Sequence, residues 1–473
     1  MKKILFPICT LCAVALLLFS CSEVSTEITA PSEDACQEQL YQVTHTDIMA
    51  LLQKNNPMKT KSGPADMTID PYVWEGDTVM FLVNDAKGWQ LISADKRACP
   101  IVVYANDEHK SLEDIMGSPM LGGWVSDVAK DIHTLKKGNY PIENENTKYW
   151  NYVEGKASAV KTKSLGPGWR LICTIDISSN STEIDHIIPT KWGGGEPWND
   201  CFPEDAFWEK MPVGSHNVAI AQILYWANKQ MGVPEYSYTN VTATTNEIIT
   251  VDSVNSVIIY DTYPVFSFGD SSSVVWSQMK THYNGSGNSD YVSYLMAKVR
   301  SLTNLVSPED YTVAEDLNAL DYFQLQSSNR NYAVDTVIRY LLQGIPSIII
   351  TDVHSNEYVY DTRACIADAY YGFTNTFEEY YIYDPYETYN GLIDIDLEYA
   401  TPEDVILVLP EGYEWCSEQH NVSMRYISMN WGLNGEGDNQ RYSVYSTLWD
   451  WVHYSMTTEV SPWKMIYNFR AAN

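Results

Sequence analysis

The side chain with the clearest chemical potential in this chain is Ser215, which opens an apolar, helix-like stretch. Residues 215–227 carry apolar side chains on most helical sides, so they predict a buried helix. A serine hydroxyl stays far from ionising at the start of a helix, and it acts as a nucleophile only with a base in contact. The alternative is that Ser215 is the N-cap of this helix, a position that serine often occupies.

Four histidines are candidates for that base. His216 is adjacent to Ser215, but neighbouring residues on a helix point about 100° apart, so it is poorly placed to serve the hydroxyl. His354, His420 and His453 lie in the C-terminal half, and the setting of His420 lacks a strand pattern. A hydrolase that uses Ser215 with a histidine of this kind stays open as an alternative.

Residues 214–223 read Gly-Ser-His-Asn-Val-Ala-Ile-Ala-Gln-Ile. They resemble the opening of the central helix in streptopain-like cysteine peptidases, whose usual pattern is Gly-Cys-Val-Ala-x-Ala-x-Ala-Gln-Ile. The resemblance implies a thiol endopeptidase ancestry, with Ser215 at the position of the nucleophilic cysteine. It also implies positions for a base, an oxyanion donor and an orienting residue, which thiol peptidase chemistry requires.

The position of the base holds an arginine. The family carries a Gly-His-Ala-x-Val-x-Asp-Gly-Tyr strand, and residues 362–370 read Thr-Arg-Ala-Cys-Ile-Ala-Asp-Ala-Tyr. Arg363 therefore replaces the histidine, 363 − 215 = 148 residues after Ser215, within the roughly 130–150 typical of papain-type spacing. A guanidinium group stays protonated and cannot act as a general base.

The position of the oxyanion donor is changed, whereas the positions that orient the histidine are retained. Residues 190–199 resemble the family's Lys-Trp-x-Gln-x-Glu-Pro-Tyr-Asn, with Gly194 in place of the oxyanion-binding glutamine. Losing one such donor typically costs about 100- to 1,000-fold in rate. Residues 430–435 resemble Asn-Trp-Gly-Trp-x-Gly, so Asn430 and Trp431 stand where the family orients and shields its histidine. The segment 371–425 is longer than usual and predicts an inserted loop over the cleft.

Together these replacements predict a pseudopeptidase that binds a peptide or protein. Ser215 at a helix N-terminus facing Arg363 would form a small anion site, suited to a carboxylate. Alternatively, Arg363 pairs structurally with a nearby acid such as Asp368 or Glu196.

The sequence predicts an α+β fold with a papain-like cysteine peptidase domain over residues 186–473. A small α+β domain over 41–150 precedes it, with strands at 78–83, 89–93 and 100–105 and a turn at 84–88. Its Ser-Ala-Asp-Lys-Arg motif at 93–97 resembles the pro-domain of streptopain-type zymogens, and the alternative is an unrelated hairpin. Residues 151–185 predict a linker with Lys156, Lys161 and Lys163, either the site where a pro-domain is cut off or an ordinary solvated linker.

The first 20 residues predict a secretion signal, with Lys2 and Lys3 before a short apolar run. Leu18-Phe19-Ser20-Cys21 resembles a bacterial lipobox, which implies that Cys21 is lipidated. Residues 21–40 lack periodicity and predict a flexible tether. We therefore expect an exported protein, anchored to the bacterial outer membrane or cell surface by lipid only.

The composition restricts the classes of partner and cofactor that this protein is expected to bind. The net charge is −31, from 30 basic and 61 acidic residues, which disfavours nucleic acid. No Cys-x-x-Cys pair or His-rich cluster indicates a metal site, and no cofactor is implied. We expect a peptide or protein ligand and the pro-domain, bound in cis. Six cysteines lie outside the signal and the lipidation position, and the sequence does not determine whether they form disulfides: Cys36, Cys99, Cys173, Cys201, Cys365 and Cys416.

Overall fold

The computed structural model describes residues 41–55, 67–86, 88–106, 109–118, 121–138, 144–155, 167–204, 210–234, 237–252, 257–273, 276–284, 290–303, 313–354, 360–388, 401–444 and 464–472. They belong to one compact unit, Tyr41–Asn473. Residues 1–40, with the predicted signal, Cys21 and the tether, lie outside the described residues.

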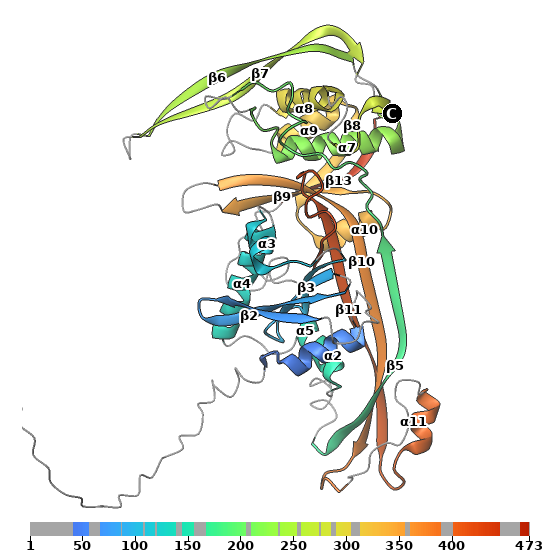
Figure 1. Cartoon of the computed structure of the whole chain (residues 1–473). Coiled ribbons are helices and arrows are strands. Elements are labelled where there is room, and N and C mark those ends of the chain that lie inside the picture. The colour runs from blue at the N-terminus through green and yellow to red at the C-terminus, as the bar shows by residue number, and fades with distance from the viewer. Residues whose placement is uncertain are drawn as a thin grey trace, which may run out of the picture. The chain divides into compact units, whose positions relative to one another are not determined.

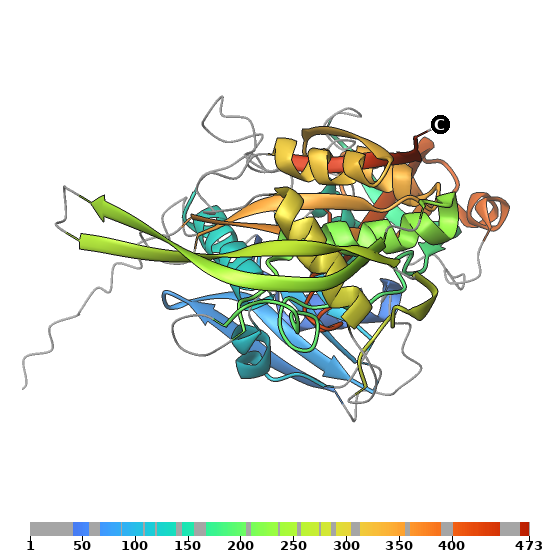
Figure 2. The ribbon, with the colours of Figure 1, turned by 90° about the horizontal axis from the view of Figure 1, so that it is seen from above.

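An eleven-stranded antiparallel sheet joins both halves of the described chain (Figure 1). Its order is β1 (Thr68–Trp74), β2 (Asp77–Asp85), β3 (Gly88–Ser93), β4 (Ile101–Ala105), β12 (Arg441–Ser443), β11 (Trp415–Asn430), β10 (Tyr360–Tyr383), β9 (Ser347–His354), β13 (Lys464–Ala471) and β8 (Leu325–Asn331). Strand β5 (Trp169–Ile184) also pairs with β10. A second sheet is the hairpin of β6 (Ser237–Asp252) and β7 (Val257–Ser273), which crosses helix α8 in Figure 2.

Helices cover both faces of this sheet, which confirms the predicted α+β class. They are α2 (His45–Asn55), α3 (Leu112–Gly117), α4 (Leu121–Lys137), α5 (Glu145–Glu154), α7 (Ser215–Met231), α8 (Asp290–Thr303), α9 (Val313–Tyr322), α10 (Val334–Leu341) and α11 (Pro402–Val408), with a short 3₁₀ turn at Trp276–Gln278. Ile348 and Ile350 of β9 pack on the side of α7, α8 and α9, whereas Ile349 packs on the side of α4 and α10. This alternation follows from the two-residue period of a strand.

The N-terminal segment contains the three predicted strands and the predicted turn. Strand β2 is buried on both faces, because Leu82 packs in the cluster that contains α4, whereas its neighbour Val83 packs with α2 and α5. Strand β4 pairs with β12 through Val103 and Tyr442, so this segment shares a sheet with the C-terminal half. The domain boundary near residue 150 stays a prediction.

Two sequence predictions about connecting segments are wrong. Residues 169–184 of the predicted linker form β5, because Cys173 and Ile175 are buried against Tyr380 of β10 and anchor an otherwise polar strand. The predicted inserted loop at 371–425 is largely the β10–β11 hairpin, paired from Tyr371↔Tyr426 to Ile382↔Trp415. Figure 1 shows this hairpin leading away from α7, so it does not cover Ser215. The three linker lysines lie outside the described residues.

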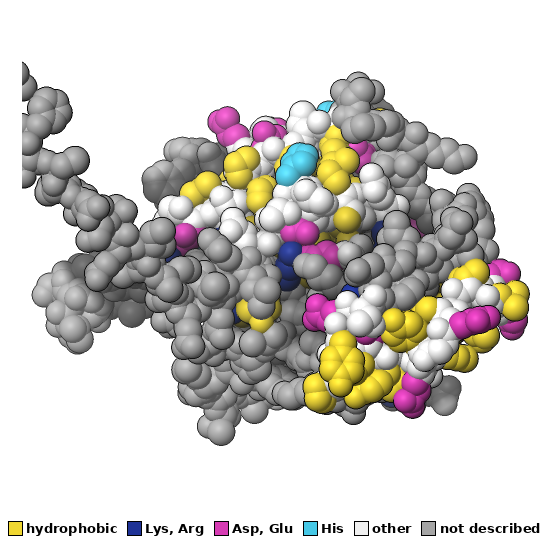
Figure 3. All heavy atoms as spheres, turned by 90° about the horizontal axis from the view of Figure 1, so that it is seen from below, with side chains coloured by type: hydrophobic (Ala, Val, Ile, Leu, Met, Phe, Trp, Pro, Cys, Tyr) yellow, Lys and Arg dark blue, Asp and Glu magenta, His cyan; other side chains and the backbone are white. Residues whose placement is uncertain are grey.

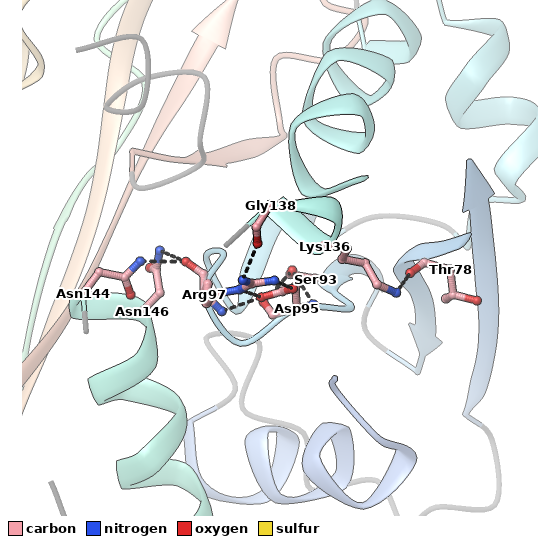
Figure 4. A network of polar contacts seen from close by, with 8 residues as sticks. All are labelled: Thr78, Ser93, Asp95, Arg97, Lys136, Gly138, Asn144 and Asn146. Carbon is pink, nitrogen blue, oxygen red and sulfur yellow. Dashed lines mark hydrogen bonds and ion pairs between the residues drawn. The ribbon is translucent and has the colours of Figure 1, made fainter. Parts of the chain in front are cut away.

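The Ser-Ala-Asp-Lys-Arg motif of the N-terminal segment forms a buried polar network (Figure 4). The guanidinium of Arg97 donates from Nε and Nη2 to both oxygens of Asp95, at 2.9 and 2.7 Å. It also donates to the carbonyl of Gly138 beyond α4, while Asn144 and Asn146 donate to the carbonyl of Arg97. The motif therefore ties the strand hairpin to the end of α4 and the start of α5.

The described cysteines are free thiols: Cys99, Cys173, Cys201, Cys365 and Cys416. Cys36 lies outside the described residues. Among the described residues, no helix is long and apolar enough to cross a membrane, and no group of His, Cys, Asp or Glu side chains could hold a metal ion.

Candidate functional site

Ser215 is the first residue of α7 and contacts the strand that carries Arg363. Its Oγ accepts a hydrogen bond from the backbone N–H of Ala364, with 3.1 Å between nitrogen and oxygen. Pairing of β10 with β11 begins only at Ile366, so the serine occupies an open edge of β10. The N-cap of α7 is Gly214, with a φ of +89° and no side-chain capping bond. The alternative reading of Ser215 as the N-cap is therefore wrong.

Arg363 immediately precedes the residue that contacts Ser215. It pairs with Thr351 of β9 in the strand register, and its side chain is half-buried. The sheet thus brings together two segments that lie 148 residues apart in the sequence (363 − 215). The acid Asp368, considered above as a partner for Arg363, makes its ion pair with His186 instead.

Sequence reasoning missed an arginine, Arg300, that lies at the start of α7. Nη1 of Arg300, in the last turn of α8, is 3.8 Å from the position that a β-carbon would take on Gly214. Burial lowers the pKa of this guanidinium, and within the described ranges no carboxylate forms an ion pair with it. In the sequence, Arg300 is one of many cations on helices, and only the packing of α8 on α7 distinguishes it.

Two side-chain bonds fix α8 against the start of α7. The hydroxyl of Thr303 donates to Oδ1 of Asn217 at 2.9 Å. The amide of Asn217 in turn donates to the carbonyl of Val213 at 2.7 Å, one residue before Gly214. These contacts position Arg300 beside the first turn of the helix.

Gly194 also lies beside the start of α7. Its carbonyl accepts a hydrogen bond from the N–H of Val213 at 2.8 Å. A β-carbon built on Gly194 would come within 4 Å of one atom outside its chain neighbours, the backbone nitrogen of Gly214 at 3.9 Å. There is therefore room for a side chain at this position, but glycine supplies no side-chain donor.

Asn430 belongs to a buried network that includes no histidine among the described residues. It donates to the carbonyl of Thr190 at 2.9 Å and accepts from Nε2 of Gln222 at 3.0 Å. The hydroxyl of Thr190 donates to Oε1 of the same glutamine at 2.8 Å. Because all three side chains are fully buried, this network holds α7, β11 and the segment that leads to Gly194 in place.

Trp431 links the site to the N-terminal segment. Its indole Nε1 donates to the hydroxyl of Tyr442 at 3.0 Å. The Tyr442 ring is in turn in edge-to-face contact with Trp124 of α4. Trp431 therefore contacts β12 rather than a base next to Ser215.

Two of the four candidate histidine bases, His216 and His420, are engaged elsewhere. Nδ1 of His216 is 3.1 Å from Oδ2 of Asp316, and both side chains are buried. His420 pairs with Glu379 on the β10–β11 hairpin, at 3.2 Å. The side chain of His354 and all of His453 lie outside what the structure describes. No described histidine forms a hydrogen bond with Ser215.

A titratable cluster that the sequence did not indicate lies further along β10. Nδ1 of His186 is 3.1 Å from each carboxylate oxygen of the fully buried Asp368. The hydrogen bond to Asp368 raises the pKa of His186, and burial raises the pKa of Asp368. Asp438 is buried nearby, and its Oδ1 has no hydrogen-bond partner within the described residues. Burial, followed by the charge of Asp368, raises the pKa of Asp438 to about 7.

Comparisons with known proteins gave structural similarities of low identity. A fragment of prointerpain A from Prevotella intermedia is 14% identical, with a TM-score of 0.44, covering 85% of this chain and 98% of that one. Active interpain A, a cysteine protease from the same organism, is 18% identical, with a TM-score of 0.33, covering 60% and 94%. No protein-family model and no curated protein matches the sequence. Both TM-scores are low, and we base the proposal below on the contacts around Ser215.

Proposed function

We propose that this chain is a peptidase-like protein without peptidase activity, which binds a peptide or protein through an anionic group at the start of α7. One observation carries the proposal. The hydroxyl of Ser215 is held by the N–H of Ala364, directly after Arg363, where a nucleophile would need a proton acceptor. The positions of the base and the oxyanion donor hold an arginine and a glycine.

The chemistry of these side chains explains the lack of hydrolysis. A serine hydroxyl whose oxygen accepts a hydrogen bond still has to lose its proton before it can attack a carbonyl. Arg363 is a cation and cannot take that proton. Gly194 offers no side-chain donor to a developing oxyanion, and each lost donor of this kind costs about 100- to 1,000-fold.

The same groups favour binding of a carboxylate. The N-terminus of a helix such as α7 presents backbone N–H groups and the positive end of the helix dipole, which suit an anion. Arg300 adds a guanidinium that lacks a carboxylate partner in the described part of the chain. An arginine beside a helix N-terminus suits the planar carboxylate at a peptide C-terminus.

The proposal includes the context that the sequence implies. Cys21 would tether the mature protein to the outer membrane or cell surface by lipid. Without autoprocessing, residues 41–150 would stay attached and serve as a partner in cis. The pairing of β4 with β12 supports this second part, because it places the N-terminal segment in the same sheet as β10 and β11.

Hydrolysis is tested with a soluble form beginning at Ser22, incubated with a broad peptide library. The matched variant is the triple replacement Ser215→Cys, Arg363→His and Gly194→Gln. We expect cleavage by the triple variant and none by the natural chain. Cleavage by the natural chain that Ser215→Ala abolishes would show that a base lies elsewhere and would overturn the proposal.

Ligand binding is tested with the same library in two forms, with a free or an amidated C-terminus. We expect the free acid to bind more tightly, and Arg300→Met to remove the difference. The control is Arg339→Met, an exposed arginine on α10. Equal affinity of all variants for both peptide forms would exclude a carboxylate site here.

A further inference from the structure

The far end of the β10–β11 hairpin exposes a group of large apolar side chains. We call the described residues 383–388 and 401–416 the hairpin tip. Tyr386 and Leu407 are 85% and 82% exposed, and three further large side chains are also exposed there: Tyr383, Ile406 and Trp415. Figure 3 shows yellow side chains gathered at this end, interspersed with magenta acids. Contiguous exposed apolar surface of this kind marks an interaction site more often than isolated surface residues do.

This exposure does not come from a poorly packed segment. Helix α11 is anchored by Val405, which is fully buried against Cys173, Ile175 and Tyr380. Its N-terminus has a capping box, in which Thr401 and Asp404 bond each other's backbone N–H. The tip therefore has its own small core, and Ile406 and Leu407 point outward from an anchored helix.

Backbone and ion-pair contacts fix the strand ends as well. The N–H of Tyr383 donates to the carbonyl of Glu414 at 2.8 Å. Arg170 of β5 donates to the buried carboxylate of Asp384, also at 2.8 Å. The exposed rings of Tyr383 and Trp415 thus stand on hydrogen-bonded strand ends, and little conformational entropy remains to be lost when a partner binds.

The charged side chains described at the hairpin tip are all acidic. Exposed acids flank the apolar side chains: Glu387, Glu403, Asp404, Glu411 and Glu414. Residues 364–424 contain 13 Asp or Glu and no Lys or Arg. The adjacent cation on β5, Arg170, is already paired with Asp384. A second copy of this chain, with a net charge of −31, and an anionic lipid surface would both be repelled.

We propose that the hairpin tip is a docking surface for a protein whose apolar contact patch is flanked by lysine or arginine side chains. Tyrosine and tryptophan are the side chains that most often dominate binding energy at protein interfaces. Complementary charge around them increases the rate of association and selects the partner. This surface lies 20 residues along β10 from Arg363 (383 − 363) and does not depend on the function proposed for the Ser215 region.

The experiment uses the chain from Ser22 onward and a fluorescent peptide of about 18 leucines and lysines, which forms a cationic amphipathic helix. The tip variant is Tyr386→Ser with Leu407→Ser. Its matched control is Tyr322→Ser with Leu342→Ser, which removes two exposed apolar side chains elsewhere. We expect about tenfold weaker binding by the tip variant and about twofold or less by the control.

A second variant tests the charge. Replacing Glu403, Glu411 and Glu414 by glutamine should weaken binding about fivefold at low salt and reduce its salt dependence. Equal effects of the tip and control variants would overturn the proposal, because the peptide would then be reporting only the net charge of the chain. Circular dichroism checks that all variants are folded.

Lipid binding is the competing outcome, and a separate arm tests it. Sedimentation with vesicles of phosphatidylcholine, alone or mixed with phosphatidylglycerol, should recover no protein. If the natural chain sediments and the tip variant does not, while peptide binding is equal for both, the tip contacts membranes and the protein-docking proposal is wrong.

Discussion

The two ends of strand β10 present opposite chemistry. At the near end, Ala364 holds Ser215, and Arg300 places a cation beside the start of α7. At the far end, beyond Tyr381, the described surface is apolar and acidic. A single strand therefore connects a half-buried cationic region with an exposed region that would attract cations.

This difference shows how little the strand itself determines about function. The backbone pairing is continuous from β9 at the near end to β5 and β11 along the hairpin. What differs is the set of helices that pack on it: helices cover both faces of the sheet at the near end, whereas one short helix packs at the far end. The near end is consequently sensitive to buried polar groups, whereas the far end is sensitive to surface chemistry.

The largest expected effect tests whether the near end is a rigid scaffold. Asn430→Leu removes the partners of Gln222, of the Thr190 carbonyl and of the Gly432 N–H. Because these groups are buried, we expect a loss of about 3 kcal/mol in the free energy of unfolding, measured with urea.

The matched control is Asn421→Leu, further along the β10–β11 hairpin, which breaks an exposed bond to Thr376. It should cost about 0.5 kcal/mol or less. Similar losses for the two variants would remove the contrast between the ends.

The next effect concerns the cluster between the two ends. Burial raises the pKa of Asp438 to about 7, while an unfolded aspartate titrates near 4. Between these values the folded protein holds a proton that the unfolded chain has released. Stability therefore falls as the pH rises through this window. The groups around Asp438 are Asp368, which raises its pKa, and His186, Lys191 and the N–H of Trp431, which lower it.

Asp438→Asn should remove this dependence. We expect its stability relative to the natural chain to increase by on the order of 2 kcal/mol between about pH 4.5 and pH 8, in urea unfolding at several pH values. Parallel pH profiles for the two proteins would show that Asp438 titrates normally.

A smaller effect tests whether the near end is a binding site. Arg300→Met removes a partly buried cation that has no carboxylate partner in the described residues, and it keeps the apolar stem. We expect the free energy of unfolding to increase by about 1 kcal/mol while affinity for a free peptide carboxylate falls. A loss of both stability and affinity would instead indicate a structural role.

The smallest effect tests the far end. Leu407→Ser should change the free energy of unfolding by less than about 0.5 kcal/mol, because the side chain is largely exposed. Val405→Ser, two residues earlier and fully buried, should cost about 2 kcal/mol or more. Thermal unfolding followed by circular dichroism compares the two, and equal losses would mean that Leu407 is part of the core of the tip.

Much of the local structure could be predicted from the sequence. The apolar pattern of residues 215–227 predicted a buried helix, and the alternating segments at 78–83 and 89–93 predicted the hairpin. Residues 169–184 were missed, because the lysines and glycines just before them were given more weight than the alternation of Leu171, Cys173 and Ile175. The hairpin at 371–425 was read as a loop, since its pairing joins residues up to 55 positions apart (426 − 371).

The sequence by itself determined which chemistry is absent, because the properties of a side chain belong to the residue. An arginine at 363 cannot be a base, a glycine at 194 cannot donate from a side chain, and residues 364–424 contain no lysine or arginine. Only the tertiary structure decided that Ser215 bonds to Ala364, that Arg300 lies beside Gly214 and that Asp438 is buried near Asp368. Each depends on packing between segments distant in the chain, and no local period or composition encodes such contacts.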